Sequence, residues 1–282
     1  MDAHRRQFRL AAMCRVLQVS RSGFYDWAAR QPSQRSQDDD ALTTHIEQIH
    51  YQYRQATGIL KTQTLLKKRG IEAGKHRIAR LRQMAGIETR RKKRFRLMRT
   101  YQRTAPAAPD LVKRGFIVTA PNLIWVGDMT VLRTREGLLY LAVVLDLYAR
   151  RVVGWAMATQ ATSDLAIAAL TMAIQQRRPK PGLICHTDQG VQYSSVAYRT
   201  VLQAHRIRAS MSRRGNCHDN AVAESFFSNL KNELTHHTAY ATRKEAKTAI
   251  FDYIEVFYNR QRPHQTLKYQ TPLEVENLYA KA

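Results

Sequence analysis

The chain has 282 residues, and its 46 Lys and Arg side chains outnumber 22 Asp and Glu, which gives a formal net charge of +24. This excess predicts an acidic polymer as partner, while 44% hydrophobic residues suffice for a core and exclude a wholly disordered basic chain. The longest apolar run, Leu138 to Leu145, is far shorter than the roughly 18 to 20 residues of a membrane-spanning helix, and the N-terminus resembles no secretory signal, so we expect a cytoplasmic protein with no membrane partner.

The charge is concentrated in the first 115 residues, which hold 26 basic and 9 acidic side chains. The three cysteines, Cys14, Cys185 and Cys217, are far apart in the sequence and odd in number. This pattern argues against a disulfide framework and against a Cys-x-x-Cys zinc site.

Residues 10–27 predict two short helices with a break at Val19-Ser20, and Ser20 is placed to cap the second. The pattern fits a helix-turn-helix and a simple helical hairpin about equally well. Residues 31–40 are polar and contain proline, which predicts a linker, and a further helix is expected to start near Asp40.

A second two-helix unit is predicted before residue 90, with a glycine-bounded turn at residues 70–74 and a basic helix over residues 75–84. Its apolar positions Ile78, Leu81 and Met84 are expected to face the core. Its basic side chains are expected to project outward; they are Lys75, Arg77, Arg80 and Arg82. Such a helix is typical of a DNA major-groove reader, which the charge of the chain favours over an ordinary solvated helix.

Residues 90–99 contain seven basic side chains, among them Arg91, Lys92, Lys93 and Arg94, and are expected to contact phosphate groups. Six such contacts would give a slope of log affinity against log salt of about −5. Residues 100–115, with two prolines, are predicted to link the two halves of the chain.

Strand-like segments follow at residues 122–132, 138–146 and 151–158, and their short connections predict an antiparallel meander. The first segment is apolar on both faces except at Asp128. A helix over residues 162–176, a strand at 183–186, a helix at 194–204 and a strand at 206–211 complete the pattern. Asp188 follows the fourth strand and is therefore expected at the edge of the same sheet.

The last carboxylate of interest is Glu224, on a helix predicted from Ala221 to about Thr235. At 100° per residue Glu224 and Lys231 share one stripe, while the apolar side chains cluster on the other side. Lys231 would therefore lie over a polyanion bound at this stripe.

Three carboxylates delivered by a central strand, a neighbouring strand end and a helix would form a hard-oxygen ligand set for Mg²⁺ or Mn²⁺. Two such ions can assist an in-line displacement at phosphorus. The alternative is that the three acids are separate surface or capping groups, and spacing alone favours that alternative.

Several sequence motifs carry a family resemblance. WVGDMT around Asp128, HTDQG around Asp188 and NCHDNAVAESFFSNLKNE around Glu224, with 35 residues between the last two acids, resemble the DDE catalytic core of insertion-sequence transposases. The match is to the OrfB type, which is related to retroviral integrases. LDLYARRVVGW (145–155) and YNRQRPHQTLKYQTP (258–272) also resemble fixed segments of that family.

The resemblance implies an α/β fold: an RNase H-like core, with a five-stranded mixed sheet and flanking helices, after an all-α helix-turn-helix region. The expected divisions are residues 1–89 for DNA binding, 90–117 as a basic linker, and 118–282 as the core with a C-terminal helical extension. It also implies that Asp128, Asp188 and Glu224 are the catalytic residues and the ligands of two Mg²⁺ or Mn²⁺ ions.

By the same resemblance, the activity is DNA cleavage and strand transfer on double-stranded DNA, at the element's terminal inverted repeats and in target DNA. A homo-oligomer on DNA, association with the nucleoid and frameshift fusion to an upstream small helix-turn-helix protein are further implied. A catalytically silent DNA-binding regulator or accessory subunit, and a nuclease without strand transfer, are the alternatives. The family's Tyr-Gly-Tyr-Arg run reads Thr57-Gly58-Ile59-Leu60 here.

Other polar residues of these motifs have less specific expectations. For Asp146 a turn-capping role is favoured over a catalytic one. His186 is either a buried, hydrogen-bonded histidine or a side chain that orients Asp188 or contacts DNA. The segment from Tyr258 to Pro272 either packs back on the core or contacts phosphate.

Overall fold

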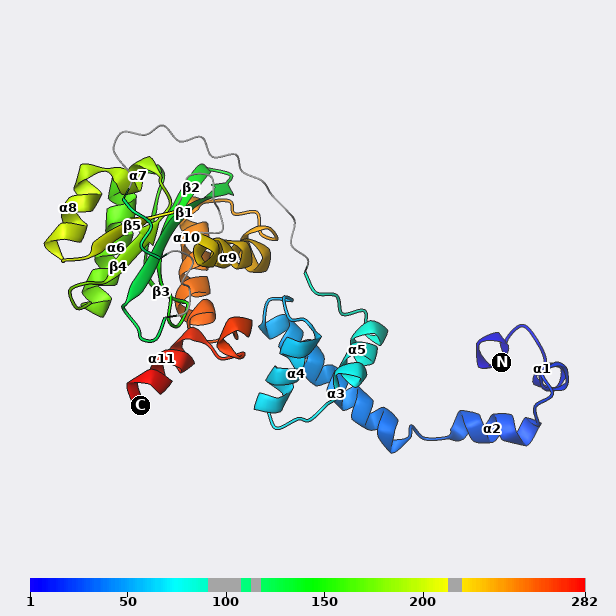
Figure 1. The fold of residues 1–282 in the computed structure, drawn as a ribbon. Helices are drawn as coiled ribbons and strands as arrows, with labels where there is room; N and C mark the ends of the chain where they lie inside the picture. The colour runs from blue at the N-terminus through cyan, green and yellow to red at the C-terminus, as the bar shows by residue number, and fades with distance from the viewer. Residues whose placement is uncertain (91–107, 113–117, 213–219, 282) are drawn as a thin grey trace.

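The computed structural model describes residues 1–90, 108–112, 118–212 and 220–281 (Figure 1). Within these residues an N-terminal helical region precedes a mixed sheet with helices on both faces, so the predicted fold class is confirmed. None of the helices described is both long and apolar enough to span a membrane.

The N-terminal region consists of short helices with the following bounds: η1 Asp2–His4, α1 Leu10–Val16, α2 Arg21–Ala29, α3 Gln34–Gln52, α4 Ile59–Lys68 and α5 Lys75–Met84. The hairpin of α1 and α2 confirms the predicted break, and the Ser20 hydroxyl accepts from the Gly23 amide at 2.9 Å. Figure 1 shows this hairpin extended away from α3, α4 and α5, which share a core centred on Ile46, Ile49 and Leu66.

The predicted linker at residues 31–40 is wrong, because α3 already begins at Gln34. The Ser33 hydroxyl caps this helix by accepting from the Ser36 amide, and the Gln34 side chain donates to Asp38 at 2.9 Å. Polar residues are compatible with an exposed helix surface, and the proline stands just before the cap, where it costs no helical hydrogen bond.

The rest of the chain forms the sheet and its covering helices. The strands are β1 Ile124–Thr134, β2 Gly137–Asp146, β3 Arg151–Ala158, β4 Ile184–Thr187 and β5 Arg208–Met211. The helices are α6 Ser163–Arg177, α7 Val191–Ser194, α8 Val196–Ala204, α9 Ala221–Leu230, α10 Arg243–Phe251 and α11 Pro272–Lys281, with π-helices η3 Lys231–Thr235 and η4 Asp252–Tyr258 and a short 3-10 turn η5 Gln265–Leu267.

The strand order is β3-β2-β1-β4-β5, with β1, β2 and β3 antiparallel as predicted and β4 and β5 parallel to β1. Side chains alternate between two cores because strand residues have a period of two. Val126 and Val143 face α9, α10 and η4, whereas Trp125 and Val144 face α6 and α8. Figure 1 shows these helix groups on opposite sides of the sheet.

The helix predicted from Ala221 to about Thr235 is confirmed in extent, but it ends in the π-helical segment η3. The helix over residues 243–258 likewise ends in a π-helical segment, η4. Wider π turns are rare and are found mostly where a helix accommodates an unusual side-chain arrangement. Here Glu233 and Tyr253, one from each π segment, are buried and hydrogen-bonded to each other at 2.8 Å.

The helical region contacts the C-terminal part of the chain at the end of α3. The Tyr53 and Phe257 ring centroids are 6.3 Å apart, and the Arg54 guanidinium lies 4.8 Å from the Phe257 ring. Ion pairs join Arg54 to Asp252 at 2.9 Å and Lys68 to Glu274 at 3.0 Å. Residues about 200 apart in the sequence thus lie side by side.

Candidate active site

Asp128 lies in the middle of β1, opposite Val143 of β2. Its side chain is only 3% exposed, and its Oδ1 accepts from the Met129 amide at 2.7 Å. Val126 and Leu132, an even number of residues away, face the core under α9, so strand alternation directs Asp128 to the same face. A carboxylate buried there requires compensation by hydrogen bonds or a cation.

Asp188 follows β4, the parallel neighbour of β1. The register pairs Ile124 with Ile184 and Val126 with His186. Continued by two residues, this register brings Asp188 opposite Asp128. A Cβ built on Gly127 would lie 3.1 Å from Thr187, which supports close approach of the two strands at this point. Asp188 Oδ1 accepts from the Gly190 amide at 3.0 Å.

Glu224 is an exposed residue in the first turn of α9, the helix that covers the Asp128 face of the sheet. The start of this helix is attached to β1, because the buried Asn220 side chain donates to the Gly127 carbonyl at 3.3 Å. Phe226, Phe227 and Leu230 are buried, as predicted for the core side of the helix.

The structure thus places Asp128 in β1, Asp188 directly after the neighbouring strand β4, and Glu224 in the first turn of α9, which covers the Asp128 face of the sheet. Among the described residues, which include Asp128, Asp188 and Glu224, no three His, Cys, Asp or Glu side chains form a group that could hold a metal ion. The donor chemistry nevertheless fits a hard divalent cation, since all three side chains offer carboxylate oxygens and none offers sulfur or imidazole.

Asp146 and His186 have structural partners. Both Asp146 oxygens accept backbone hydrogen bonds, from Asn122 at 2.7 Å and Tyr148 at 2.9 Å, which confirms the turn-capping role. Burial raises the pKa of Asp146, and the two amides act in the opposite direction. His186 is buried, with Nδ1 2.8 Å from the Ser210 hydroxyl, in agreement with the buried, hydrogen-bonded interpretation.

Comparison with known families gives separate matches for the helical region and for the sheet-containing part of the chain. Two families described as "Integrase core domain" match residues 118–217 and 205–272, and one described as "HTH-like domain" matches residues 37–95. The HTH-like match covers most of the region from α3 to α5 and begins after α1 and α2. For the hairpin of α1 and α2, a DNA-binding helix-turn-helix and a simple helical hairpin therefore both stay possible interpretations.

Similarity to curated relatives extends over nearly the whole chain. "Insertion element IS600 uncharacterized 31 kDa protein" of Shigella sonnei is 42% identical over 95% of this chain and 98% of its own length. "Transposase InsF for insertion sequence IS3A" of Escherichia coli is 36% identical over 98% of this chain and 97% of its own length. The chain belongs to the IS3-type insertion-sequence transposases. Its resemblance to that family, expected from the motifs, is confirmed.

One solved structure found by comparison is the HTLV-2 integrase catalytic core domain in complex with magnesium. It is 19% identical in sequence, with a TM-score of 0.43, and the alignment covers 55% of the transposase and 97% of the integrase core.

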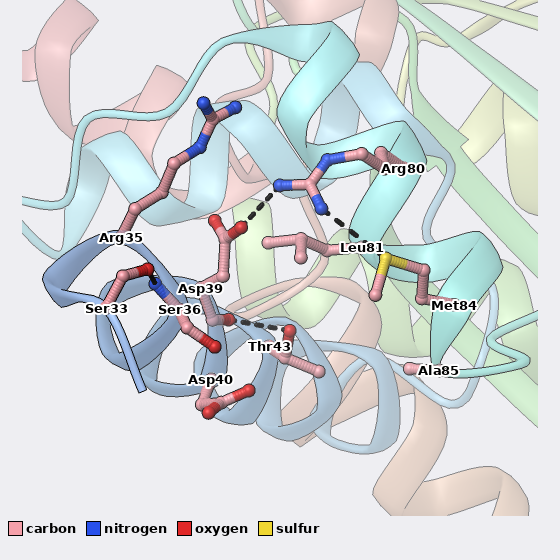
Figure 2. A pocket seen from close by; sticks show the side chains of 10 residues that line it. All are labelled: Ser33, Arg35, Ser36, Asp39, Asp40, Thr43, Arg80, Leu81, Met84 and Ala85. Atoms are coloured by element: carbon pink, nitrogen blue, oxygen red, sulfur yellow. Dashed lines mark hydrogen bonds and ion pairs between the residues drawn. The ribbon is translucent and has the colours of Figure 1, made fainter. Parts of the chain in front are cut away.

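The basic residues expected to contact DNA differ in their surroundings. On α5 of the transposase, Lys75 is exposed, whereas Arg77 and Arg80 both donate to Asp39 of α3, Arg77 at 2.7 Å. These hydrogen bonds lower the pKa of Asp39. Figure 2 shows Arg80 reaching across to Asp39 at the edge of a cavity of about 400 Å³ between α3 and α5.

Two expectations for α5 are wrong. Arg82 does not project outward but is 5% exposed, donating to the Thr62 hydroxyl at 3.3 Å and the Thr89 hydroxyl at 3.0 Å. Met84 does not face the core and is 73% exposed. The hydroxyls of Thr62 on α4 and Thr89 after α5 accept hydrogen bonds and so offset the cost of burying the guanidinium. Helical periodicity alone could not predict these acceptors. Burial lowers the pKa of Arg82.

Lys231 of the transposase is partly buried at the junction of α9 and η3. Arg91, Lys92, Lys93 and Arg94 lie outside the described residues. Contact of any of these residues with DNA stays a prediction.

The sequence interpretation overlooked Glu233. It is 4% exposed and accepts two hydrogen bonds at its Oε1 from Arg262, the shorter at 2.7 Å. Burial acts to lower the pKa of Arg262, but the negative charge and hydrogen bonds of Glu233 have the larger effect and raise this pKa. The position of an acid between Leu230 and Leu234, on the apolar side of a helix, could have predicted that Glu233 is buried and paired with a cation. That cation is Arg262, in the C-terminal motif. That motif therefore packs back on the core through Arg262.

Proposed function

We propose that Asp128, Asp188 and Glu224 are the catalytic carboxylates with which this transposase cleaves DNA and joins a freed 3′-hydroxyl to target DNA. What supports the proposal is that Asp128 lies on β1 and Asp188 directly follows β4, the parallel neighbour of β1, while α9, the helix that bears Glu224, covers the Asp128 face of the sheet. Two carboxylates held close together repel each other unless a cation lies between them or one of them takes up a proton.

The three carboxylates would hold two Mg²⁺ or Mn²⁺ ions. When bound, such ions supply charge stabilisation for the attacking and leaving oxygens of an in-line phosphoryl transfer. The protein side chains hold the ligands in place: β1 fixes Asp128, the Gly190 amide orients Asp188, and the Asn220 amide attaches the start of α9 to β1. A buried position at 3% exposure also excludes water from Asp128.

The DNA itself would be held by basic residues outside the carboxylates. We assign this role to Lys231, about two turns from Glu224 on the same helical stripe, to the exposed Lys75, and to Arg91, Lys92, Lys93 and Arg94. Residues 1–89 would form the DNA-binding region, 90–117 the linker and 118–282 the catalytic unit. A homo-oligomer on the terminal repeats, and fusion to an upstream small protein, belong to the same proposal.

Joining of a labelled terminal-repeat duplex to a supercoiled plasmid in Mg²⁺ tests this function. We expect joined product from the full chain. Glu224→Gln should lower joining by at least about a hundredfold, because one charged ligand is lost at constant side-chain size. DNA binding by that variant should be near normal.

The matched control is Glu47→Gln, which makes the same chemical change at an exposed position of α3 and should join as the unmodified chain does. Cleavage without joining would favour a nuclease, and DNA binding with neither reaction would favour a regulator. Loss of binding together with joining in Glu224→Gln would point to a folding defect in that variant.

A further inference from the structure

A second cavity, distant in sequence from the carboxylates, lies between the start of α4 and the loop after η4. Its volume is about 400 Å³, and its walls come from residues 56–61 and from the segment that includes Arg262, Gln265 and Tyr269. One wall thus belongs to the helical region and the other to the C-terminal part of the catalytic half. A group bound here would contact both.

The cavity has more cationic than anionic side chains. Arg262 is already neutralised by Glu233, whose carboxylate also accepts from the Tyr253 hydroxyl. Lys61 has no hydrogen-bonding or ion-pair partner among the described residues, and Arg262 and Glu233 are the charged groups that act on it. Burial, followed by the charge of Arg262, lowers the pKa of Lys61 to about 8.

The nearby imidazole gives a second indication of excess positive charge. Burial and then the charges of Arg262, Lys61 and Arg150 lower the pKa of His264 well below its ordinary value. Three cations therefore act on this one imidazole. Keeping a lysine charged away from water and without an ion-pair partner costs free energy. An anion that binds beside it offsets this cost.

The backbone contributes donors on the same side. Gly58 is the N-cap of α4 and has no side chain to cap it, so the first-turn amides of Ile59, Leu60 and Lys61 have no intrahelical acceptor. All three residues line the cavity. Helix N-terminal amides and an adjacent ammonium are a donor set suited to an oxyanion.

We propose that the cavity between α4 and the loop after η4 binds a phosphate group, with Lys61 as the principal cation and the α4 amides as hydrogen-bond donors. This inference rests on the proposed function, because a DNA-cleaving transposase binds DNA and the DNA backbone is then the expected source of the phosphate. A backbone phosphate bound here would place one DNA strand against both halves of the transposase. Free inorganic phosphate shares the same chemistry and is distinguished by the experiment.

The test uses the full chain, the variant Lys61→Met, and Lys67→Met as matched control. Lys67 is an exposed lysine on the same helix and lies outside the cavity. The first arm measures the melting temperature in inorganic phosphate against chloride of equal ionic strength at pH 7. The second arm measures the slope of log DNA affinity against log salt.

We expect phosphate to raise the melting temperature of the unmodified chain and of Lys67→Met but not of Lys61→Met. We also expect Lys61→Met alone to make the salt slope shallower by about 0.9, the value for one phosphate contact. Phosphate protection without a change in slope would assign the site to free phosphate. Absence of both effects, or equal effects in the two variants, would overturn the proposal.

Lys61→Gln provides a second variant that keeps a polar side chain if Lys61→Met does not fold. The strand-transfer assay is scored separately on the same preparations. A chain that binds phosphate through Lys61 but joins no DNA would contradict the proposed function and leave this site standing. The site also predicts that phosphate protection weakens as the pH rises above about 8, because Lys61 then loses its proton.

Discussion

Asp128 and Asp146 are buried carboxylates of the same sheet, yet their surroundings differ. Asp146 stands at the end of β2, where two backbone amides and the Arg177 guanidinium, at 3.7 Å, stabilise its charge. Asp128 stands in mid-strand, on the face covered by α9. The sequence predicted the structural role of Asp146 from its position before a tight turn, and it predicted the importance of Asp128 from its isolation in an apolar strand.

Asn220 is the residue that attaches α9 to β1. Asn220→Ala removes the hydrogen bond to the Gly127 carbonyl, so we expect stability to fall by about 1 to 3 kcal/mol and strand transfer to fall by roughly tenfold to a hundredfold. Thermal melting and the joining assay measure the two effects. Asn229→Ala, a partly buried position on the same helix, is the control; equal losses in both variants would argue against a specific role for Asn220.

Lys61 predicts a pH dependence of stability. Its pKa is about 8 in the folded chain and about 10.4 when unfolded, so its destabilising effect is complete below pH 8 and disappears as the pH rises to about 10.4. Without phosphate, Lys61→Met should be more stable than the unmodified chain at pH 7, by about 1 to 3 kcal/mol. The difference should shrink by pH 10 in urea titrations. A difference independent of pH would contradict this assignment.

At the scale of elements, hydrophobic periodicity and capping residues were enough to predict the strands of the sheet and most helices. They failed at the start of α3, where polar residues read as a linker form an exposed helix capped by Ser33. They also gave no indication that two helices end in π segments. Nor did they predict that Glu233 pairs with Arg262, which lies 29 residues further along the chain. Local patterns carry no information about such pairs.

The buried ion pair between Glu233 of η3 and Arg262 of the loop after η4 should contribute more to stability than the exposed ion pairs of the chain. Glu233→Gln leaves Arg262 charged and buried, so we expect a loss of about 3 to 5 kcal/mol in unfolding free energy. Asp252→Asn, which breaks the more exposed pair with Arg54, should cost less than about 1 kcal/mol. Urea denaturation measures both, and equal costs would show that burial does not decide the contribution of these pairs.

At the scale of the whole molecule, the sequence predicted a helical DNA-binding front and a sheet-based catalytic half. It did not predict how they meet, because contacts such as Lys68 with Glu274 join surface residues that no motif connects. For the candidate site, the motifs predicted Asp128, Asp188 and Glu224 as the catalytic carboxylates, and this role stays a prediction. The attachment of α9 to β1 through Asn220 required the three-dimensional structure.

The basic segment between the halves predicts a strong salt dependence of DNA binding. Replacing the six Lys and Arg residues of segment 91–99 with Gln should make the slope of log affinity against log salt shallower by about 5, if each neutralises one phosphate. Arg90 is left in place because its side chain donates to Gln55 at 3.0 Å. A slope equal to that of the unmodified chain would show that this segment does not contact phosphate.

The central claim is that Asp128, Asp188 and Glu224 together bind divalent metal ions. Anomalous diffraction from crystals of the full chain soaked in Mn²⁺ tests it most directly, because manganese positions are then seen independently of the protein density. We expect manganese coordinated by oxygens of Asp128 and Asp188, with Glu224 completing the ligand set. Manganese bound without contact to Glu224, or only at sites remote from the two aspartates, would contradict it.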